Sequence, residues 1–227
     1  MQLDFDFEKS ESYHIDDFIV FKSNKNAFNF VNGKFDNDIN NRIFLITGSE
    51  KSGKTYLSHI WQKKSGAIFL DLNKMNRIRD LKEFYITLIN FIQFGKNYIL
   101  EDLDEIKLEE EKLFHLINII NEKQAKLLIT SKKLVVDFLF ETNDLQSRFQ
   151  NIINFKIGFL DKNSKIFFIM KLFADKQLLI DKKVINFISK NTSFVYKDIF
   201  DKIEYIVKRF TQEQRRKKIT VEFLKSL

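Results

Sequence analysis

The sequence predicts an α/β fold, with a mainly parallel five-stranded sheet covered by helices and a small all-helical domain after it. Over residues 42–157, short apolar runs alternate with segments of helical period. Such alternation requires crossover connections between parallel strands. After residue 160 only segments of helical period follow. We therefore expect an α/β domain over residues 13–160 and a helical domain over residues 161–227.

Five short apolar runs are expected to form the strands. They are 42–47 (RIFLIT), 67–72 (AIFLDL), 97–104 (NYILEDLD), 125–131 (AKLLITS) and 153–157 (INFKI). Near-continuous apolar composition is typical of parallel strands that are buried on both faces. The first run ends at a glycine and the third ends in acidic residues, so both strand ends are candidates for a functional site.

Helices are expected between the strands and throughout the C-terminal part. Within the α/β part they cover 55–64, 81–92 and 109–123, with a short helical stretch before the fifth strand. The third helix begins with glutamates, which are favourable at the positive end of the helix dipole. The C-terminal segments of helical period are 165–178, 181–191, 195–210 and 220–227.

Composition restricts the possible classes of function. The chain has 227 residues, of which 44% are apolar and 30% charged, as in soluble globular proteins. No apolar run reaches the roughly 18–20 residues of a membrane span, and the first residues are acidic where a signal peptide is basic. We expect a cytoplasmic protein. The absence of cysteine excludes disulfides and thiolate metal sites, and the three histidines lie far apart, so no zinc site is expected.

A formal net charge of +7 raises the question of an anionic partner such as nucleic acid. The basic residues are mainly lysines spread along the chain, which is typical of a solvated surface. Residues 208–218 (KRFTQEQRRKK) form the one concentrated basic stretch. We interpret it as surface rather than as a DNA contact, although direct DNA contact stays open.

The stretch after the first strand fits the phosphate-binding pattern G-x-x-x-x-G-K-[ST]. Its glycines let backbone N–H groups turn toward phosphate oxygens at the start of a helix. The lysine would neutralise the β- and γ-phosphates. An ordinary glycine-containing turn is the alternative, but the strand before and the helix after favour a nucleotide site. The expected nucleotide-binding residues are Gly48, Ser49, Glu50, Lys51, Ser52, Gly53, Lys54, Thr55 and Tyr56.

The acidic end of the third strand supplies a second half of such a site. Glu101 and Asp102 follow an apolar strand, as a metal-binding Walker B element does, and Thr55 would add its hydroxyl to a Mg²⁺ ion. The cofactors expected are ADP or ATP with Mg²⁺. P-loop ATPases usually have an aspartate where Glu101 stands, so this longer side chain predicts weak hydrolysis or none by the chain itself. A solvated strand end is the alternative.

Two further positions are candidates for catalysis. Thr130 and Ser131 end the fourth strand, where they would lie beside a γ-phosphate, and Ser131 is the candidate sensor. Arg148 precedes the fifth strand in a chain whose basic residues are mostly lysine, which suggests a task that needs a planar guanidinium. The alternative for Arg148 is a surface ion pair with Asp144.

Taken in order, these parts resemble the AAA+ ATPases of the bacterial replication initiator family, the DnaA/Hda family. Residues 13–31 resemble the segment that lies over the adenine in that family, and 144–149 (DLQSRF) match its arginine-finger segment. Residues 171–181 (KLFADKQLLID) are similar to a lid stretch of the Hda branch. The resemblance spans nearly the whole chain and implies an AAA+ P-loop domain followed by a helical lid. It also implies a lid cation against the phosphates, for which Lys197 is the candidate.

The N-terminal residues carry the second sign of the Hda branch. Residues 2–7 (QLDFDF) resemble the peptide by which proteins dock on the replicative sliding clamp. Gln2 would bind the rim of a pocket that Leu3, Phe5 and Phe7 fill, in a segment (1–12) that orders only on binding. An edge strand or a fraying terminus is the alternative. The chain also ends after the helical part, with no helix-turn-helix to read origin DNA.

The resemblance implies a regulator of replication initiation whose partners are DnaA and the β sliding clamp of DNA polymerase III. Docked on a DNA-loaded clamp, it would offer Arg148 in trans to the ATP held by DnaA and so prevent re-initiation. DNA would then be contacted through the clamp, and no membrane partner is expected. A homo-oligomer is possible. The alternatives are an autonomous ATPase of the helicase-loader type and a non-catalytic AAA+ adaptor that recruits DnaA.

Overall fold

The computed structural model describes residues 13–34, 41–71, 74, 77–106, 108–212 and 218–227. The clamp-docking residues expected at 2–7 lie outside the described residues, and so do residues 213–217 of the basic stretch. No helix in the described ranges is long and apolar enough to cross a membrane.

The expected five-stranded sheet is present, and all of its strand pairs are parallel. In sequence order its strands are β1 (Ile43–Thr47), β2 (Ile68–Phe69), β3 (Asn97–Leu100), β4 (Lys126–Ser131) and β5 (Ile153–Lys156). The spatial order is β2-β3-β4-β1-β5, so β1 lies between β4 and β5. The α/β fold class that the alternating pattern predicted is therefore confirmed.

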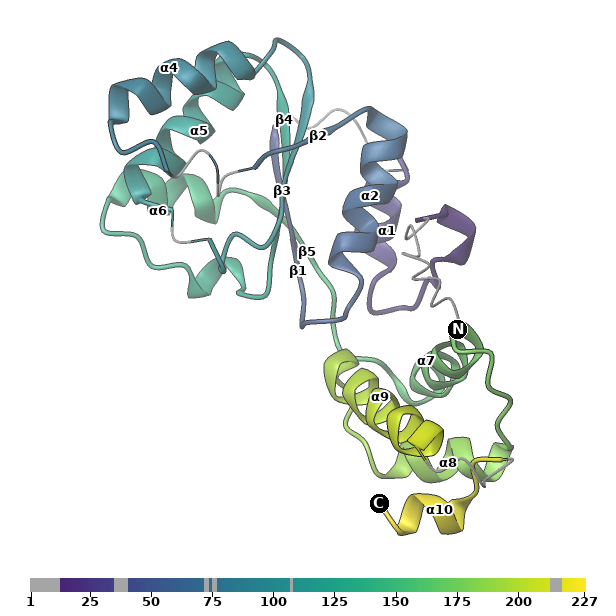
Figure 1. The fold of residues 1–227 in the computed structure, drawn as a ribbon. Helices are drawn as coiled ribbons and strands as arrows, with labels where there is room; N and C mark the ends of the chain where they lie inside the picture. The colour runs from purple at the N-terminus through teal and green to yellow at the C-terminus, as the bar shows by residue number, and fades with distance from the viewer. Residues whose placement is uncertain (1–12, 35–40, 72–73, 75–76, 107, 213–217) are drawn as a thin grey trace, which may run out of the picture.

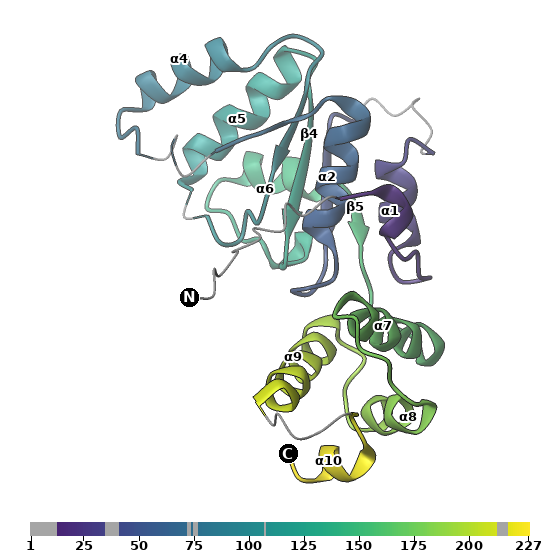
Figure 2. The same ribbon diagram turned by 45° about the vertical axis from the view of Figure 1, so that its right-hand side comes forward.

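Helices cover both faces of the sheet, as Figures 1 and 2 show. On one face lie α1 (Lys25–Val31) and α2 (Lys54–Ser65); on the other lie α4 (Leu81–Phe91), α5 (Glu110–Glu122) and α6 (Asn143–Gln150). Two 3₁₀ turns, η1 (Ile15–Asp17) and η2 (Val135–Asp137), also belong to this part. Placing helices on both faces is what right-handed crossovers between parallel strands produce.

Side chains of β1 alternate between two apolar cores. Phe44 and Ile46 belong to the core under α1 and α2, whereas Ile43 and Leu45 belong to the core under α4, α5 and α6. All five residues of β1 are buried. Because successive side chains of a strand point to opposite faces, one buried strand serves both layers.

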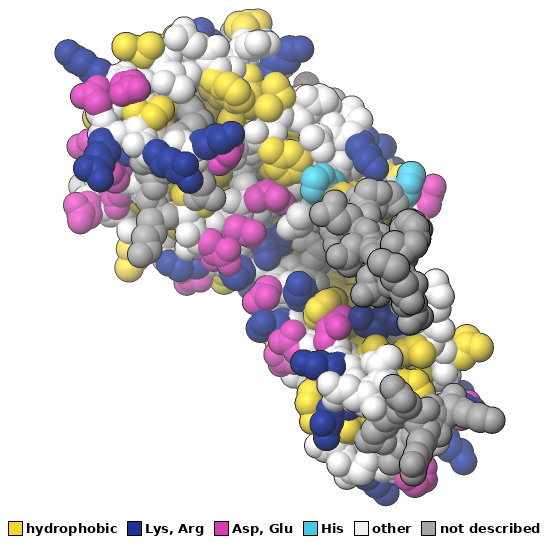
Figure 3. Space-filling view, viewed as in Figure 1, with side chains coloured by type: hydrophobic (Ala, Val, Ile, Leu, Met, Phe, Trp, Pro, Cys, Tyr) yellow, Lys and Arg dark blue, Asp and Glu magenta, His cyan; other side chains and the backbone are white. Residues whose placement is uncertain are grey.

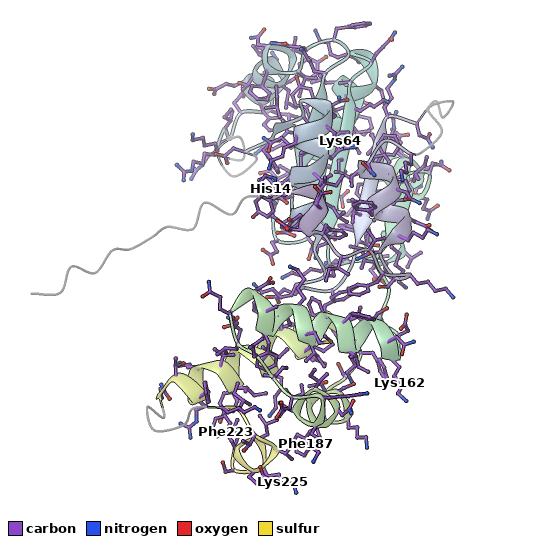
Figure 4. The ribbon with its side chains drawn as sticks, turned by 90° about the vertical axis from the view of Figure 1, so that its right-hand side faces the viewer. His14, Lys64, Lys162, Phe187, Phe223 and Lys225 are labelled. Carbon is purple, nitrogen blue, oxygen red and sulfur yellow. The ribbon has the colours of Figure 1, made fainter. Side chains whose placement is uncertain are left out.

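The C-terminal part consists of α7 (Lys162–Asp175), α8 (Lys182–Lys190), α9 (Tyr196–Gln212) and α10 (Val221–Lys225). Figure 4 shows this group of helices below the sheet, with Phe187 of α8 and Phe223 of α10 in the same small bundle. Asp161 begins α7 by accepting hydrogen bonds from the backbone N–H groups of Asn163 and Ser164. The Lys165 ammonium donates to carbonyl oxygens at the end of α8 and so satisfies groups that a helix end leaves free.

The helical part does not stand apart from the sheet, because one apolar core extends from α1 and α2 into α7, α8, α9 and α10. Two polar contacts accompany it. The Tyr196 hydroxyl lies 2.9 Å from the Ser23 hydroxyl, and the backbone N–H of Leu160 donates to the carbonyl oxygen of Phe194. The position of α9 relative to the sheet is therefore fixed by packing and by hydrogen bonds.

Three local features differ from the sequence pattern. The run 67–72 contributes only the two residues of β2 to the sheet, since β2 is an edge strand with one neighbour. The run 97–104 stops being strand at Leu100, and Asp102 has a left-handed backbone (φ 46°) that no strand continues through. Helix α1 lies in a segment to which the pattern assigned no secondary structure.

Candidate functional site

The loop from Gly48 to Gly53 joins β1 to α2 and has the backbone geometry of a phosphate-binding loop. Gly53 begins the helix in a left-handed conformation (φ 95°), which glycine adopts without strain. At Gly48 a Cβ atom would lie 2.7 Å from the hydroxyl oxygen of Ser52 and 3.0 Å from Cβ of Ile157. Both glycines of the pattern are thus required by the local geometry.

Lys54 is the first residue of α2, and its side chain folds back into the loop. The ammonium donates to the carbonyl oxygens of Gly48 (3.0 Å) and Ser49 (3.1 Å), and only 6% of the residue is exposed. Burial lowers the pKa of Lys54, and the nearby charge of Asp102 opposes that shift. A cation is therefore held at the centre of the loop, where a phosphate would place negative charge.

Three buried polar atoms beside the loop make no hydrogen bond within the described part of the chain. They are the hydroxyl oxygens of Ser52 and Ser58 and one carboxylate oxygen, Oε1, of Glu101. Burial raises the pKa of Glu101. The hydroxyls of Ser58 and Thr55 are close enough to oppose that shift, although the Ser58 hydroxyl has no hydrogen bond of normal geometry. Buried polar groups are normally paired, and their clustering here favours a polar ligand.

Asp102 is positioned by Thr130 on the neighbouring strand. The backbone N–H of Asp102 donates to the Thr130 hydroxyl (2.9 Å), and the next N–H, of Leu103, donates to the Thr130 carbonyl. Burial raises the pKa of Asp102, and Lys54 opposes that shift. Thr130 therefore holds the acidic strand end close to the loop.

Ser131, the candidate sensor, is fully buried at the end of β4. Its carbonyl oxygen accepts the N–H of Gly48, and its hydroxyl accepts the N–H of Lys133. Lys132, between them, turns outward: its ammonium pairs with Glu105 and lies 3.9 Å from Glu50. From this strand end, Lys132 reaches the cavity described next.

A cavity of about 490 Å³ opens over the loop. It brings together much of the expected site: Glu50, Lys51, Gly53, Lys54, Thr55, Tyr56 and Asp102. It is also lined by Tyr13, which belongs to the segment 13–31 that the family resemblance placed over the adenine, and by Glu105 and Lys132, which the sequence did not identify. Their position was partly foreseeable, because Lys132 directly follows the polar end of β4 and Glu105 follows the acidic end of β3.

The N-terminal segment packs on α2 through aromatic side chains. The Tyr56 hydroxyl donates to the carbonyl oxygen of His14 (2.7 Å), and Tyr13 stacks on His59 with the ring centroids 4.0 Å apart. Figure 4 shows His14 beside α2. The ring of Phe18 lies 3.0 Å from the position that a Cβ on Gly53 would take. Tyr13, which lines the cavity, and Phe18, beside Gly53, therefore both border the loop.

Lys197, which the family resemblance proposed as a lid cation, contacts the loop directly. Its ammonium lies 3.0 Å from a carboxylate oxygen of Glu50 and 3.4 Å from Asp201 on the next turn of α9. The Glu50 contact raises the pKa of Lys197, and the same contact lowers the pKa of Glu50. Helix α9 is thus linked to the loop by an ion pair.

Arg148 lies at the other end of the sheet from the loop. It lines a cavity of about 200 Å³ together with Arg42 and Ile43, at the start of β1, whereas Gly48 follows the end of β1. Five strand residues at about 3.3 Å each separate the two ends by roughly 16 Å. The guanidinium is therefore too far from its own loop to contact a phosphate held there.

The Arg148 side chain is held by its neighbours. It donates to the carboxylate of Asp144 (3.1 Å) and to the side-chain oxygen of Asn118 (2.7 Å). The guanidinium carbon lies 5.1 Å from the ring centroid of Phe114. The side chain remains 39% exposed, so one edge stays open to solvent. The ion pair with Asp144, which the sequence offered as the alternative, is present.

Comparison with known proteins shows similarity in sequence to chromosomal replication initiators. No protein-family model matches the chain. The chromosomal replication initiator DnaA of Buchnera aphidicola is 23% identical over an alignment covering 97% of this chain and 53% of that protein. The chain spans about half the length of the curated relatives it matches.

Solved structures show the same fold. Domain III of Thermotoga maritima DnaA superposes with a TM-score of 0.71 at 17% identity and covers 93% of both chains. AMPPCP-bound DnaA from Aquifex aeolicus gives 0.62 at 23% identity over 86% of this chain and 64% of that one. The chain has the AAA+ fold. The RuvB Holliday junction branch migration motor of Thermotoga maritima gives 0.60 at 13% identity, covering 82% and 60%, so this AAA+ fold alone does not specify one task.

We predict that Glu101→Gln stabilises the nucleotide-free protein near neutral pH. The folded state raises the pKa of this carboxyl, so stability is lost as pH rises above the ordinary value of 4.5. A neutral amide removes that loss. The gain in unfolding free energy should be clearly larger at neutral pH than near pH 4.5.

Denaturant unfolding at the two pH values measures the change, with Glu141→Gln, at an exposed carboxylate, as the control. An equal gain at both pH values, or a loss at neutral pH, would contradict the assignment of a buried and poorly solvated charge.

Proposed function

We propose that the chain binds a nucleoside di- or triphosphate at the loop between β1 and α2. The observation that carries this proposal is the buried ammonium of Lys54 inside a glycine-bounded loop at a helix start. The unpaired buried oxygens of Ser52, Ser58 and Glu101 support it, because each lies at or beside the loop. The similar Aquifex aeolicus DnaA was solved with AMPPCP bound, which supports an adenine nucleotide.

The residues at the loop also fit a Mg²⁺ ion carried by the nucleotide. In P-loop sites the Ser/Thr hydroxyl of the motif and a strand-end carboxylate hold the ion together with phosphate oxygens. Thr55 and Asp102 both line the cavity, and Glu101, the residue before Asp102, has a buried oxygen with no hydrogen bond among the described residues. No cluster of three or more His, Asp or Glu side chains that could hold a metal occurs within the described ranges, so the ion would depend on the phosphates. When bound, Mg²⁺ supplies neutralisation of the phosphate charge.

We further propose that the helical part over residues 161–227 acts as the lid of this site and that the protein regulates replication initiation. In this proposal the nucleotide-bound chain docks on the DNA-loaded sliding clamp in the cytoplasm through residues 2–7. It then offers Arg148 to the ATP held by DnaA and stimulates its hydrolysis. Sequence similarity to DnaA and the separation of Arg148 from its own loop support this proposal.

Two alternatives to this regulatory role predict different patterns of ATP hydrolysis. A helicase-loader-type ATPase would hydrolyse its own ATP, which the aspartate-to-glutamate difference at Glu101 does not favour. A non-catalytic adaptor would bind DnaA without changing its ATP turnover. One measurement separates all three: turnover of DnaA-bound ATP with and without this protein, the clamp and DNA, beside turnover by this protein alone.

We predict that Lys54→Ala abolishes nucleotide binding, because the variant loses the charge at the centre of the loop. In the wild type, ADP at about a hundredfold excess over its Kd should add about 2.7 kcal/mol of stability, which the variant should lose. Calorimetry and thermal unfolding measure both effects. Lys64→Ala, at the far end of the same helix (Figure 4), is the matched control. Unchanged ADP affinity in Lys54→Ala would remove the basis for the nucleotide site.

We predict that removing residues 2–7 leaves folding and nucleotide binding intact but eliminates clamp binding. The expected contact uses apolar side chains of an extended peptide in pockets of the clamp. Surface plasmon resonance on the immobilised clamp measures it, with Gln2→Ala as the milder variant. A truncated chain that still binds the clamp at wild-type affinity would place the docking surface elsewhere.

We predict that Arg148→Ala retains folding, ADP binding and clamp binding yet loses stimulation of DnaA. Arginine fingers contribute on the order of 10³–10⁵ in rate, so the loss should be severe. Arg148→Lys should fail almost as badly, because an ammonium does not reproduce the guanidinium fork. Arg42→Ala, in the same cavity, is the control. Normal stimulation by Arg148→Ala would refute the trans role, and loss of only its own ATPase activity would favour the loader-type alternative.

A further inference from the structure

Glu50 is an acidic residue inside the loop, and it holds two lysines from different parts of the fold. One carboxylate oxygen lies 3.0 Å from the ammonium of Lys197 and 3.9 Å from that of Lys132. Lys197 comes from helix α9, and Lys132 follows β4. Each lysine has one further carboxylate partner, Asp201 for Lys197 and Glu105 for Lys132. Glu50 is the partner that the two share.

The next residue of the loop adds a second contact with α9. Lys51 has a left-handed backbone (φ 61°), and its ammonium lies 4.8 Å from the ring centroid of Phe200. Figure 3 shows acidic and basic side chains side by side at the waist of the molecule, where α9 approaches the loop. The middle of the loop therefore faces the helical part through two adjacent residues.

The side chains lining the cavity over the loop carry balanced charge. Three lysines, Lys51, Lys54 and Lys132, face three carboxylates, Glu50, Asp102 and Glu105. A polyanionic ligand gains most where cations are not already neutralised by nearby carboxylates, because each such carboxylate also repels it. The affinity of this site for a further phosphate therefore depends on which of its lysines are already paired with carboxylates.

Different groups of the protein would contact the different phosphates of a bound nucleotide. In a loop of this kind, backbone N–H groups hold the α- and β-phosphates, and the motif lysine bridges to the β- and γ-phosphates. A third phosphate extends beyond this cradle, toward side chains that border it. Lys132 lines the cavity, and Lys197 lies within 3.0 Å of a loop side chain that also lines it. Glu50 engages both.

We infer that Glu50 is a specificity residue whose carboxylate competes with the terminal phosphate for Lys132 and Lys197. It thereby lowers the affinity of the site for a nucleoside triphosphate relative to a diphosphate. This inference rests on the proposed nucleotide binding. A diphosphate leaves the contacts of Glu50 in place, whereas a triphosphate gains these two cations only by displacing the carboxylate, which then lies beside it as a like charge.

The test compares ADP with a non-hydrolysable ATP analogue by calorimetry on the full chain. In Glu50→Gln, the ratio of affinity for the analogue to affinity for ADP should rise about fivefold. This corresponds to about 1 kcal/mol, the upper range of the energies of exposed charge pairs. ADP affinity should change less than about twofold. A ratio that stays at the wild-type value, or moves toward ADP, overturns the inference.

Two further variants separate competition from a general loosening of α9. Asp201→Asn removes the other partner of Lys197 but leaves Glu50 in place as the competing carboxylate, so the affinity ratio should rise less than in Glu50→Gln. A rise as large as that of Glu50→Gln would overturn the role assigned to Glu50. In a Lys197→Met background, Glu50→Gln should lose at least about half of its effect, as coupled residues do in a double-mutant cycle. An unchanged effect in that background overturns the role assigned to Lys197. A wild-type chain that binds neither nucleotide overturns the nucleotide site itself, which is a different failure.

Discussion

The position of β1 between β4 and β5 is the constraint on which the site depends. The N–H of Gly48 donates to the carbonyl oxygen of Ser131 on one side, and the carbonyl oxygen of Thr47 accepts the N–H of Ile157 on the other. The end of β1 is thus fixed by both neighbours just before the loop begins. Because β1 is buried along its full length, the loop cannot shift without disturbing both apolar cores.

Near that fixed end of β1, several buried charged and polar groups are unfavourable without a ligand. Burial lowers the pKa of Lys54 and raises the pKa values of Glu101 and Asp102, so burial disfavours the charged form of each of these groups. Three buried oxygens make no hydrogen bond among the described residues. Natural proteins accept such local destabilisation chiefly at functional sites, where a bound ligand offsets it. This local destabilisation favours a functional role for the loop and the strand ends over a stabilising one.

The sequence predicted the elements whose signal is local. The glycine–lysine pattern after an apolar run located the loop, and the alternating pattern located the sheet. The run 67–72 predicted β2 as a strand but not its shortness, because the pairing of an edge strand depends on the one strand beside it and not on its own composition. The helix α1 lacked a recognisable period over its seven residues.

Contacts between distant residues were beyond any pattern. Ser23 and Tyr196 meet across 173 positions of sequence, and Glu50 meets Lys197 across the junction of the two parts. Lys197 became a candidate through a family resemblance and Glu50 through the loop pattern, but nothing in the sequence predicted the ion pair between them. Glu105 likewise lines the cavity because tertiary packing brings it there. Only the three-dimensional structure shows that the acidic residue of the loop and the cations around it form one network.

The two candidate functional regions lie at opposite ends of β1. A fold similar to both DnaA and RuvB leaves the task undecided, so the task has to be inferred from where the charged groups stand. The loop follows one end, and Arg148 lies near the other, where Asp144 and Asn118 hold it against Phe114.

In the proposed trans role, the guanidinium would have to exchange these contacts for a phosphate on another molecule. Such an exchange is favourable only where a partner surface approaches closely enough to exclude water, because exposed pairs of this kind contribute at most about 1 kcal/mol. Arg148 would therefore act when a partner is docked and stay paired with Asp144 otherwise, which makes docking, rather than the arginine itself, the controlling step of the proposed activity.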